Sequence, residues 1–193
     1  MGEFGIYFEL GREHILDING YDHILFVVAL SAVYQLSDWK KVLILVTAFT
    51  IGHSLTLALA VLDVVQVNRG LIEFLIPVTI FITAFTNILK GEHSANRNIQ
   101  LNYLFALFFG LIHGLGFSNY LKSILGKSEE LVTQLFAFNV GLEVGQIFVV
   151  ASTLIIGLIV TQILGKSRRD WNLVISSAVA GVAVVLMIET WNW

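Results

Sequence analysis

The sequence predicts an all-α protein, a polytopic membrane bundle of about six transmembrane helices that forms one domain over residues 1–193. Composition is the first observation behind this prediction. Hydrophobic residues make up 56% of the chain and charged residues 13%, whereas ordinary soluble domains contain about 25% charged residues. Length is the second: a crossing helix needs about 20 largely apolar residues, so the chain has no room for a separate soluble domain.

The third observation is a succession of apolar runs between clusters of charged residues. In chain order, the predicted spans are Tyr21–Leu36, Trp39–Val61, Leu71–Leu89, Gln100–Tyr120, Leu131–Leu164 and Trp171–Thr190. The first run is short for a complete crossing, so residues 2–18 can form a short N-terminal interfacial or re-entrant helix that leads into it. The fifth run is longer than a bilayer requires, so it can kink at Gly141 and Gly145 or begin in the interface.

Basic residues predict the orientation, because cytoplasmic loops of membrane proteins carry an excess of lysine and arginine. In a six-span arrangement, the basic residues on the side of the termini are Arg12, Arg69, Lys122 and Lys127. Those on the opposite side are Lys40, Lys41, Lys90, Arg97, Lys166, Arg168 and Arg169. We therefore expect a protein integral to the bacterial inner (cytoplasmic) membrane, with both termini outside.

Composition also limits the partners. The formal net charge of −3 and the lack of a basic tract argue against nucleic acid. The chain has no cysteine and only two methionines, so sulfur ligands are not expected and any bound metal must be held by nitrogen and oxygen. The expected partners are the lipid bilayer and a metal ion, and the sequence allows a homo-oligomer without specifying one.

A small set of polar residues interrupts or borders the apolar runs. An ionisable group in the middle of a bilayer costs at least about 2.5 kcal/mol and usually serves a function. The candidate metal ligands are His14, Asp22, His23, His53, His113, Asn139 and Glu143. The first three stand before or at the start of the first span, the next two lie within the second and fourth spans, and the last two within the fifth.

Helix geometry predicts that these residues share a depth. Each residue advances about 1.5 Å along a helix, so His53 and His113 lie past the midpoint of outward-running helices, in the same half of the membrane as the start of the first span. The two candidates of the fifth span lie in its outer or middle portion and project from one helical face with Gln146. Because the clusters are distant in sequence but similar in depth, we predict one shared site.

Each candidate also has a structural interpretation. Asp22 and His23 can be an interfacial helix start that the helix dipole stabilises, and a ring such as that of His53 or His113 can bond a neighbouring carbonyl. Several glycines near these residues allow the close helix approach that a small site requires, although plain packing explains them equally well. They are Gly52, Gly110, Gly114, Gly116, Gly141 and Gly145.

Four motifs in this order resemble the HupE/UreJ family of small membrane proteins, which is associated with nickel uptake for hydrogenase and urease. They are Gly20-Tyr-Asp-His-Ile-Leu-Phe26 after His14, Ala48-Phe-Thr-Ile-Gly-His-Ser-Leu-Thr-Leu57, Phe109-Gly-Leu-Ile-His-Gly-Leu-Gly-Phe117 and Phe138-Asn-Val-Gly-Leu-Glu-Val-Gly-Gln146. The resemblance implies a nickel permease-like membrane protein that binds metal through a motif in which five residues separate a histidine from an Asp-His pair.

The sequence departs from the family pattern at two places. Seven residues separate His14 from Asp22, which indicates either a two-residue insertion or a displaced His14 with Asp17 in its place. The glutamate that nickel permeases carry shortly after a His-Gly pair is absent after His113-Gly114. These departures are typical of a divergent branch, and for this reason the family's nickel specificity is not carried over.

Our leading hypothesis is a permease for a divalent transition metal, with nickel, zinc or cobalt as ions that imidazole and carboxylate ligands suit. Asp22, His23, His53 and His113 are the expected ligands, and the remaining candidates are further ligands or support them. The alternative is an intramembrane zinc-dependent hydrolase that acts on lipid or peptide, with Glu143 or Asp22 as general base. This alternative is motivated by the lack of a clear polar path through the inner half beyond the hydroxyls of Thr47, Thr50 and Thr83. An accessory or metal-sensing role is also open.

Overall fold

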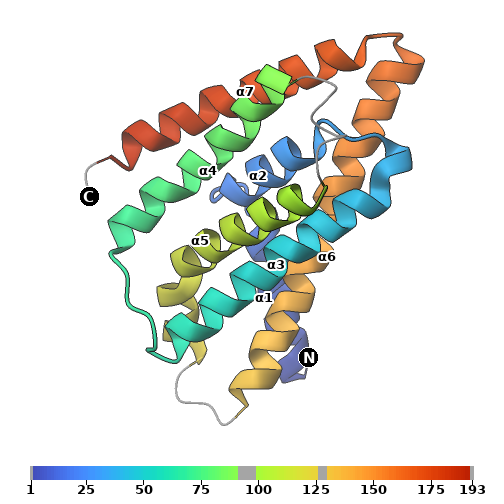
Figure 1. Cartoon of the computed structure of the whole chain (residues 1–193). Coiled ribbons are helices and arrows are strands. Elements are labelled where there is room, and N and C mark those ends of the chain that lie inside the picture. The colour runs from blue at the N-terminus through green and yellow to red at the C-terminus, as the bar shows by residue number, and fades with distance from the viewer. Residues whose placement is uncertain (1, 91–98, 126–129, 192–193) are drawn as a thin grey trace.

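The computed structural model describes residues 2–90, 99–125 and 130–191, and every regular element within them is helical. The helices are α1 (Glu3–Leu16), α2 (Asp22–Ser31), α3 (Trp39–Val61), α4 (Arg69–Lys90), α5 (Ile99–Leu125), α6 (Leu131–Leu158) and α7 (Arg168–Glu189). A short 3-10 turn, η1 (Leu36–Asp38), precedes α3, and a π-helical turn, η3 (Ile159–Ile163), extends α6. The all-α prediction is confirmed, and the helices pack as one bundle (Figure 1).

The predicted count of six spans is not confirmed. Within the described residues, four helical stretches are long and apolar enough to cross a membrane: Leu36–Val61, Arg69–Leu89, Leu131–Ile163 and Arg168–Glu189. They correspond to the second, third, fifth and sixth predicted spans. The stretches Asp22–Ser31 and Asn102–Ser118 are apolar but shorter. The 10 residues of α2 cover about 15 Å, or half of a hydrocarbon core, so the first predicted span does not cross alone.

The start of the chain forms two helices in succession, α1 and α2, separated by residues 17–21. α1 packs against α6 so closely that a Cβ on Gly11 would lie 1.9 Å from the carbonyl oxygen of Phe138, and one on Gly141 would lie 1.9 Å from that of Phe8. Both α1 and α2 contact α6. The unusual length of α6 is therefore explained by its packing against both short helices (Figure 1).

α3 and α5 pack side by side in the same direction. An added Cβ on Gly110 would lie 2.1 Å from the carbonyl oxygen of Phe49, and one on Gly114 would lie 2.2 Å from that of His53. In return, Gly52 of α3 meets the backbone of Leu107. Side chains cannot fit at such separations, so the glycines bring two backbones together and align the functional residues of α3 and α5 at one level.

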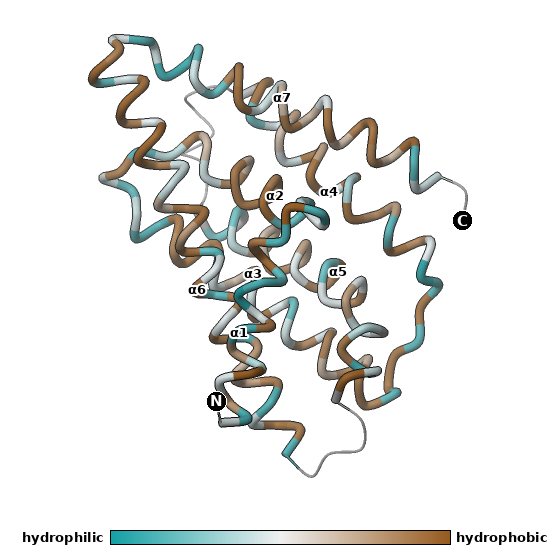
Figure 2. The backbone as a smooth tube through the Cα atoms, turned by 180° about the vertical axis from the view of Figure 1, so that it is seen from behind, coloured by the Kyte–Doolittle hydropathy of each residue, from teal (hydrophilic) through white to brown (hydrophobic). Residues whose placement is uncertain are grey.

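Large apolar side chains cover the outside of the bundle. Val132, Ile163 and Ile188 expose 81%, 70% and 69% of their surface, which a protein in water would rarely tolerate in such number. Figure 2 shows hydrophobic residues along most of each helix, with hydrophilic ones gathered at connections such as that between α6 and α7. This surface matches a lipid bilayer.

α7 lies against α4 and runs in the opposite direction. Trp191, just after α7, packs against Phe74 near the start of α4, with ring centroids 5.2 Å apart. On the buried side, the Asn172 side chain donates a hydrogen bond of 2.9 Å to the backbone oxygen of Asn87. α4 is thus held between α7 and the centre of the bundle, where it contacts α2 and α5.

Candidate metal centre

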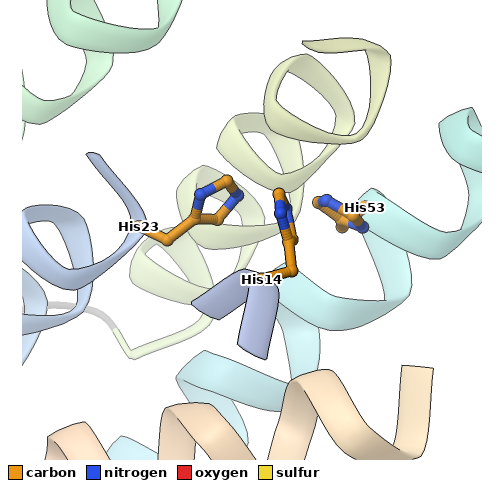
Figure 3. A group of neighbouring side chains, drawn as sticks. All are labelled: His14, His23 and His53. Atoms are coloured by element: carbon orange, nitrogen blue, oxygen red, sulfur yellow. The ribbon is translucent and has the colours of Figure 1, made fainter. Parts of the chain in front are cut away.

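Four histidines from four helices meet at the break between α1 and α2. His14 lies in the last turn of α1 and His23 in the first turn of α2, while His53 and His113 lie in the middle of α3 and α5. The ring centroid of His23 lies 4.5 Å from that of His14 and 5.1 Å from that of His113. His53 lies 6.0 Å from His14, and Figure 3 shows His14, His23 and His53 with their rings turned toward one another.

The side-chain donors form two groups that are compact enough for a metal ion. One nitrogen each from His14, His23 and His53 lie within 4.8 Å of one another, and so do donor atoms of Asp22, His23 and His113. An ion with four tetrahedral bonds of about 2.1 Å holds its donors about 3.4 Å apart. Small side-chain rotations would therefore complete either group, and the two groups share His23.

Several ring nitrogens in this cluster have no hydrogen-bond partner among the described residues. These nitrogens are His14 Nε2, His23 Nε2, both nitrogens of His53, and His113 Nδ1. His53 and His113 are fully buried and His23 exposes only 4% of its surface. A buried polar atom left without a partner costs about 1–3 kcal/mol, so a cluster of them is unfavourable unless a ligand accepts their lone pairs. A bound cation fits this set of donors.

Neighbouring groups orient two of the rings. His23 Nδ1 lies 3.0 Å from Asp22 Oδ1, to which it donates its proton when neutral, and this leaves the Nε2 lone pair free. The hydroxyl of Thr79 donates to the backbone oxygen of Ile76 at 2.7 Å, so its oxygen accepts the Nε2 proton of His113 at 3.1 Å. The free lone pair of His113 is then on Nδ1, the atom without a partner within the described part of the chain.

Two of the sequence candidates lie outside these groups. Glu143 Oε1 accepts a hydrogen bond of 2.6 Å from the hydroxyl of Thr47. A second hydrogen bond between α3 and α6 runs from the hydroxyl of Thr50 to Gln146 Oε1, at 2.8 Å. The Asn139 Oδ1 atom is buried and has no hydrogen-bond partner in the described ranges. Neither Asn139 nor Glu143 belongs to the two groups, so their role in metal binding stays a prediction.

An open cavity of about 890 Å³ leads to the centre. His14, Asp22, His23 and His113 line its inner end. Its outer wall carries the carboxylates of Glu13, Asp17 and Glu73 and the guanidinium groups of Arg12 and Arg69. Each arginine is paired with a glutamate, Arg12 with Glu9 and Arg69 with Glu73. The unpaired acidic surplus gives the cavity a potential that concentrates cations.

Two features of the site were not predicted from the sequence. Thr79 orients His113 from a distance of 34 residues in the chain, and a threonine within an apolar run carries no signal of this role. The second is Glu73, which is paired with Arg69 at 2.7 Å and belongs with it to the lining of the cavity. The acidic charge at the start of the third predicted span was the available signal.

The bundle and its histidine cluster define the class: an α-helical membrane protein with a His/carboxylate group of the kind that binds divalent metals. A family model described as HupE / UreJ protein matches residues 1–193. The chain therefore belongs to the HupE/UreJ family, and the resemblance seen in the four motifs is confirmed. No curated protein and no solved structure matches the chain.

Proposed function

We propose that this protein is a permease for a divalent transition metal ion, nickel, zinc or cobalt, and that the ion binds among His14, Asp22, His23, His53 and His113. The observation that carries this proposal is the set of buried imidazole nitrogens without partners in the described chain, all near one another. Imidazole and carboxylate donors suit these three ions. Membership of a family of metal-transport-like membrane proteins supports the same function.

The two overlapping donor groups favour a stepwise passage of the ion. Asp22, His23 and His113 line the open cavity, whereas His53 does not. An ion that enters first meets the group at the cavity floor and can then move toward His53 while it keeps its bond to His23. Exchange of one ligand at a time avoids the large cost of a bare ion in a low-dielectric interior.

We further propose that the cavity faces the outside of a bacterial inner membrane, with both termini on the same side. The distribution of lysine and arginine along the chain supports this orientation. The cavity wall includes Arg69 and Glu73 at the start of α4, which lies on the outer side in that arrangement. Metal ions would then be attracted from outside, as an uptake protein requires.

Metal stoichiometry of the purified protein tests the proposal. The wild-type protein, dialysed against nickel, cobalt or zinc and analysed by elemental mass spectrometry, should retain one ion per chain. A His53→Ala/His113→Ala variant should retain none, because it removes a ligand from each donor group. His93→Ala is the matched control, since sequence places this fifth histidine in a polar segment between helices. A wild-type protein without metal, or a double variant with unchanged binding, would contradict the proposal.

The size of the open cavity favours one second candidate, a zinc-dependent hydrolase. A volume of about 890 Å³ exceeds what a metal ion needs and could admit part of a lipid or peptide. The expected general bases are less favourable, since Asp22 is bonded to His23 and Glu143 to Thr47. Zinc-loaded protein in lipid vesicles should release fatty acid or cleave peptide if this candidate is correct, and Asp22→Asn should abolish the release.

A further inference from the structure

Three phenylalanines form a layer directly behind the histidines. Phe26, Phe49 and Phe109 lie on α2, α3 and α5, and each is three or four residues from the histidine of its own helix. That spacing is one helical turn, so each phenylalanine stands on the same face as its histidine, about 5 Å further along. The ring of Phe26 lies 4.9 Å from that of Phe49 and 5.8 Å from that of Phe109. All three phenylalanines are therefore displaced from their histidines toward the same side of the cluster.

This layer, which we call the phenylalanine layer, separates the metal centre from the rest of the bundle. Phe26, Phe49 and Phe109 expose 0%, 1% and 8% of their surface. The ring of His113 packs on it, 5.3 Å from Phe26 and 5.2 Å from Phe49. A layer of rings without polar atoms excludes water, and such constrictions act as barriers to ions in membrane proteins.

A second cavity, of about 250 Å³, lies beyond the phenylalanine layer. Phe109 belongs to the phenylalanine layer and also lines this second cavity. Polar groups that line the cavity belong to Tyr34, Thr83, Thr86, Asn87 and Asn102. Asn102 precedes His113 by 11 residues of α5, which corresponds to about 16 Å. The second cavity therefore lies toward the end of the bundle opposite the acidic cavity.

α4 connects the metal centre to the second cavity by a row of hydroxyl groups. Thr79 contacts His113 Nε2 at 3.1 Å, and the hydroxyl of Thr83 donates to the backbone oxygen of Thr79 at 2.9 Å. Thr86 continues the row into the cavity. Residues spaced by four and then three positions share one helical face, so the three threonines form a row from His113 to the second cavity.

We propose that the second cavity is a water-filled exit compartment for a partly hydrated divalent cation, which passes the phenylalanine layer along the threonine row of α4. The identity of the cargo rests on the function proposed above. A volume of about 250 Å³ has room for several water molecules around a cation. Neutral hydroxyl and amide oxygens hold transition metals more weakly than imidazole does, and weak sites favour release.

Accessibility of single cysteines tests the exit compartment, because the chain has no native cysteine to remove. Thr83→Cys and Thr86→Cys proteins, reconstituted with known orientation, should react with a membrane-impermeant thiol reagent from one face only. Glu73→Cys, in the acidic cavity, should react from the other face. Thr153→Cys is the matched control, because Thr153 also donates to the carbonyl four residues before it, at 2.9 Å, and lines neither of these two cavities.

Each labelling outcome supports or contradicts the exit compartment, whether or not the protein transports metal. Labelling of both second-cavity cysteines from the face opposite Glu73→Cys would support the exit compartment. Failure to label would overturn it, as would labelling from the same face as Glu73→Cys or only by a membrane-soluble reagent, which would indicate a lipid-filled pocket. The labelling pattern stays informative even if the protein binds no metal, so it can fail independently of the proposed function.

Transport measurements complete the test. In proteoliposomes that take up nickel or cobalt, Thr83→Val should keep wild-type metal stoichiometry but lower the uptake rate roughly fivefold, as expected for the loss of one oxygen contact. Thr153→Val should transport like the wild type. Equal rates in both variants would contradict a role for Thr83 in the exit path. No uptake by the wild-type protein would instead contradict the permease itself.

Discussion

At the scale of single residues, Thr79 decides which nitrogen of His113 keeps a free lone pair. Its oxygen accepts the Nε2 proton, so Thr79→Val leaves that proton without an acceptor and allows the ring to turn. Contacts of this kind are worth about 10–100-fold in metal affinity. We expect Thr79→Val to weaken metal binding within that range, measured by competition with a chelator, and Thr153→Val to bind normally. Unchanged affinity in Thr79→Val would rule out the orienting contact.

A substitution at Glu143 tests whether this carboxylate is a metal ligand or a structural group. Its Oε1 accepts a hydrogen bond from Thr47, and it belongs to neither donor group. Glu143→Gln keeps an oxygen that can accept this bond, so we expect the variant to bind one metal ion with affinity within about twofold of the wild type. The same chelator competition measures it. Complete loss of the ion in Glu143→Gln would instead identify Glu143 as a ligand, as the sequence analysis allowed.

The histidines were predictable from the sequence, because an ionisable side chain in an apolar run is costly and usually serves a function. Their positions along the helices predicted that His53 and His113 lie at one level, and the structure brings both close to His23. Thr79 and the phenylalanine layer were not predictable. Threonine and phenylalanine are ordinary residues of membrane helices, so their role depends on which neighbours the fold supplies.

At the scale of helices, glycines set the distances between α1 and α6. A methyl group on Gly11 or Gly141 would lie 1.9 Å from a backbone oxygen of the other helix, whereas one on Gly181 of α7 meets nothing within 4 Å. Gly11→Ala and Gly141→Ala must therefore push the helices apart at a cost of about 1–3 kcal/mol. We expect both to lower the unfolding temperature in detergent and Gly181→Ala to leave it unchanged. Equal temperatures in all three would show that α1 is not packed as described.

The break between α1 and α2 was only partly predictable. The first apolar run is short for a crossing, and this predicted an additional helix before it. The packing of that helix on α6 was not predictable from hydropathy, because the contact depends on the absence of a side chain at Gly11 and Gly141. The consequence for the site is large: the C-terminal end of α1 supplies His14 and the first turn of α2 supplies Asp22 and His23.

At the scale of the whole molecule, the histidine cluster lies between two cavities toward opposite ends of the bundle. The acidic cavity opens to it directly, and the phenylalanine layer separates it from the second cavity. Composition predicted a membrane protein, and the four motifs predicted the family. The cavities were not predictable, because residues that are distant in sequence line them and no sequence motif marks such a set. Transport direction, the choice of metal and a homo-oligomeric state stay predictions.

Anomalous X-ray scattering from crystals of metal-loaded protein tests the metal centre most directly. Data at the nickel, cobalt and zinc absorption edges identify the element and its ligands together. We expect one peak among the four histidines, about 2.0–2.2 Å from His23 Nε2 and from at least two further donors of His14, Asp22, His53 or His113. A loaded protein with no peak in this cluster, or with its peak only at surface carboxylates, would contradict the metal centre.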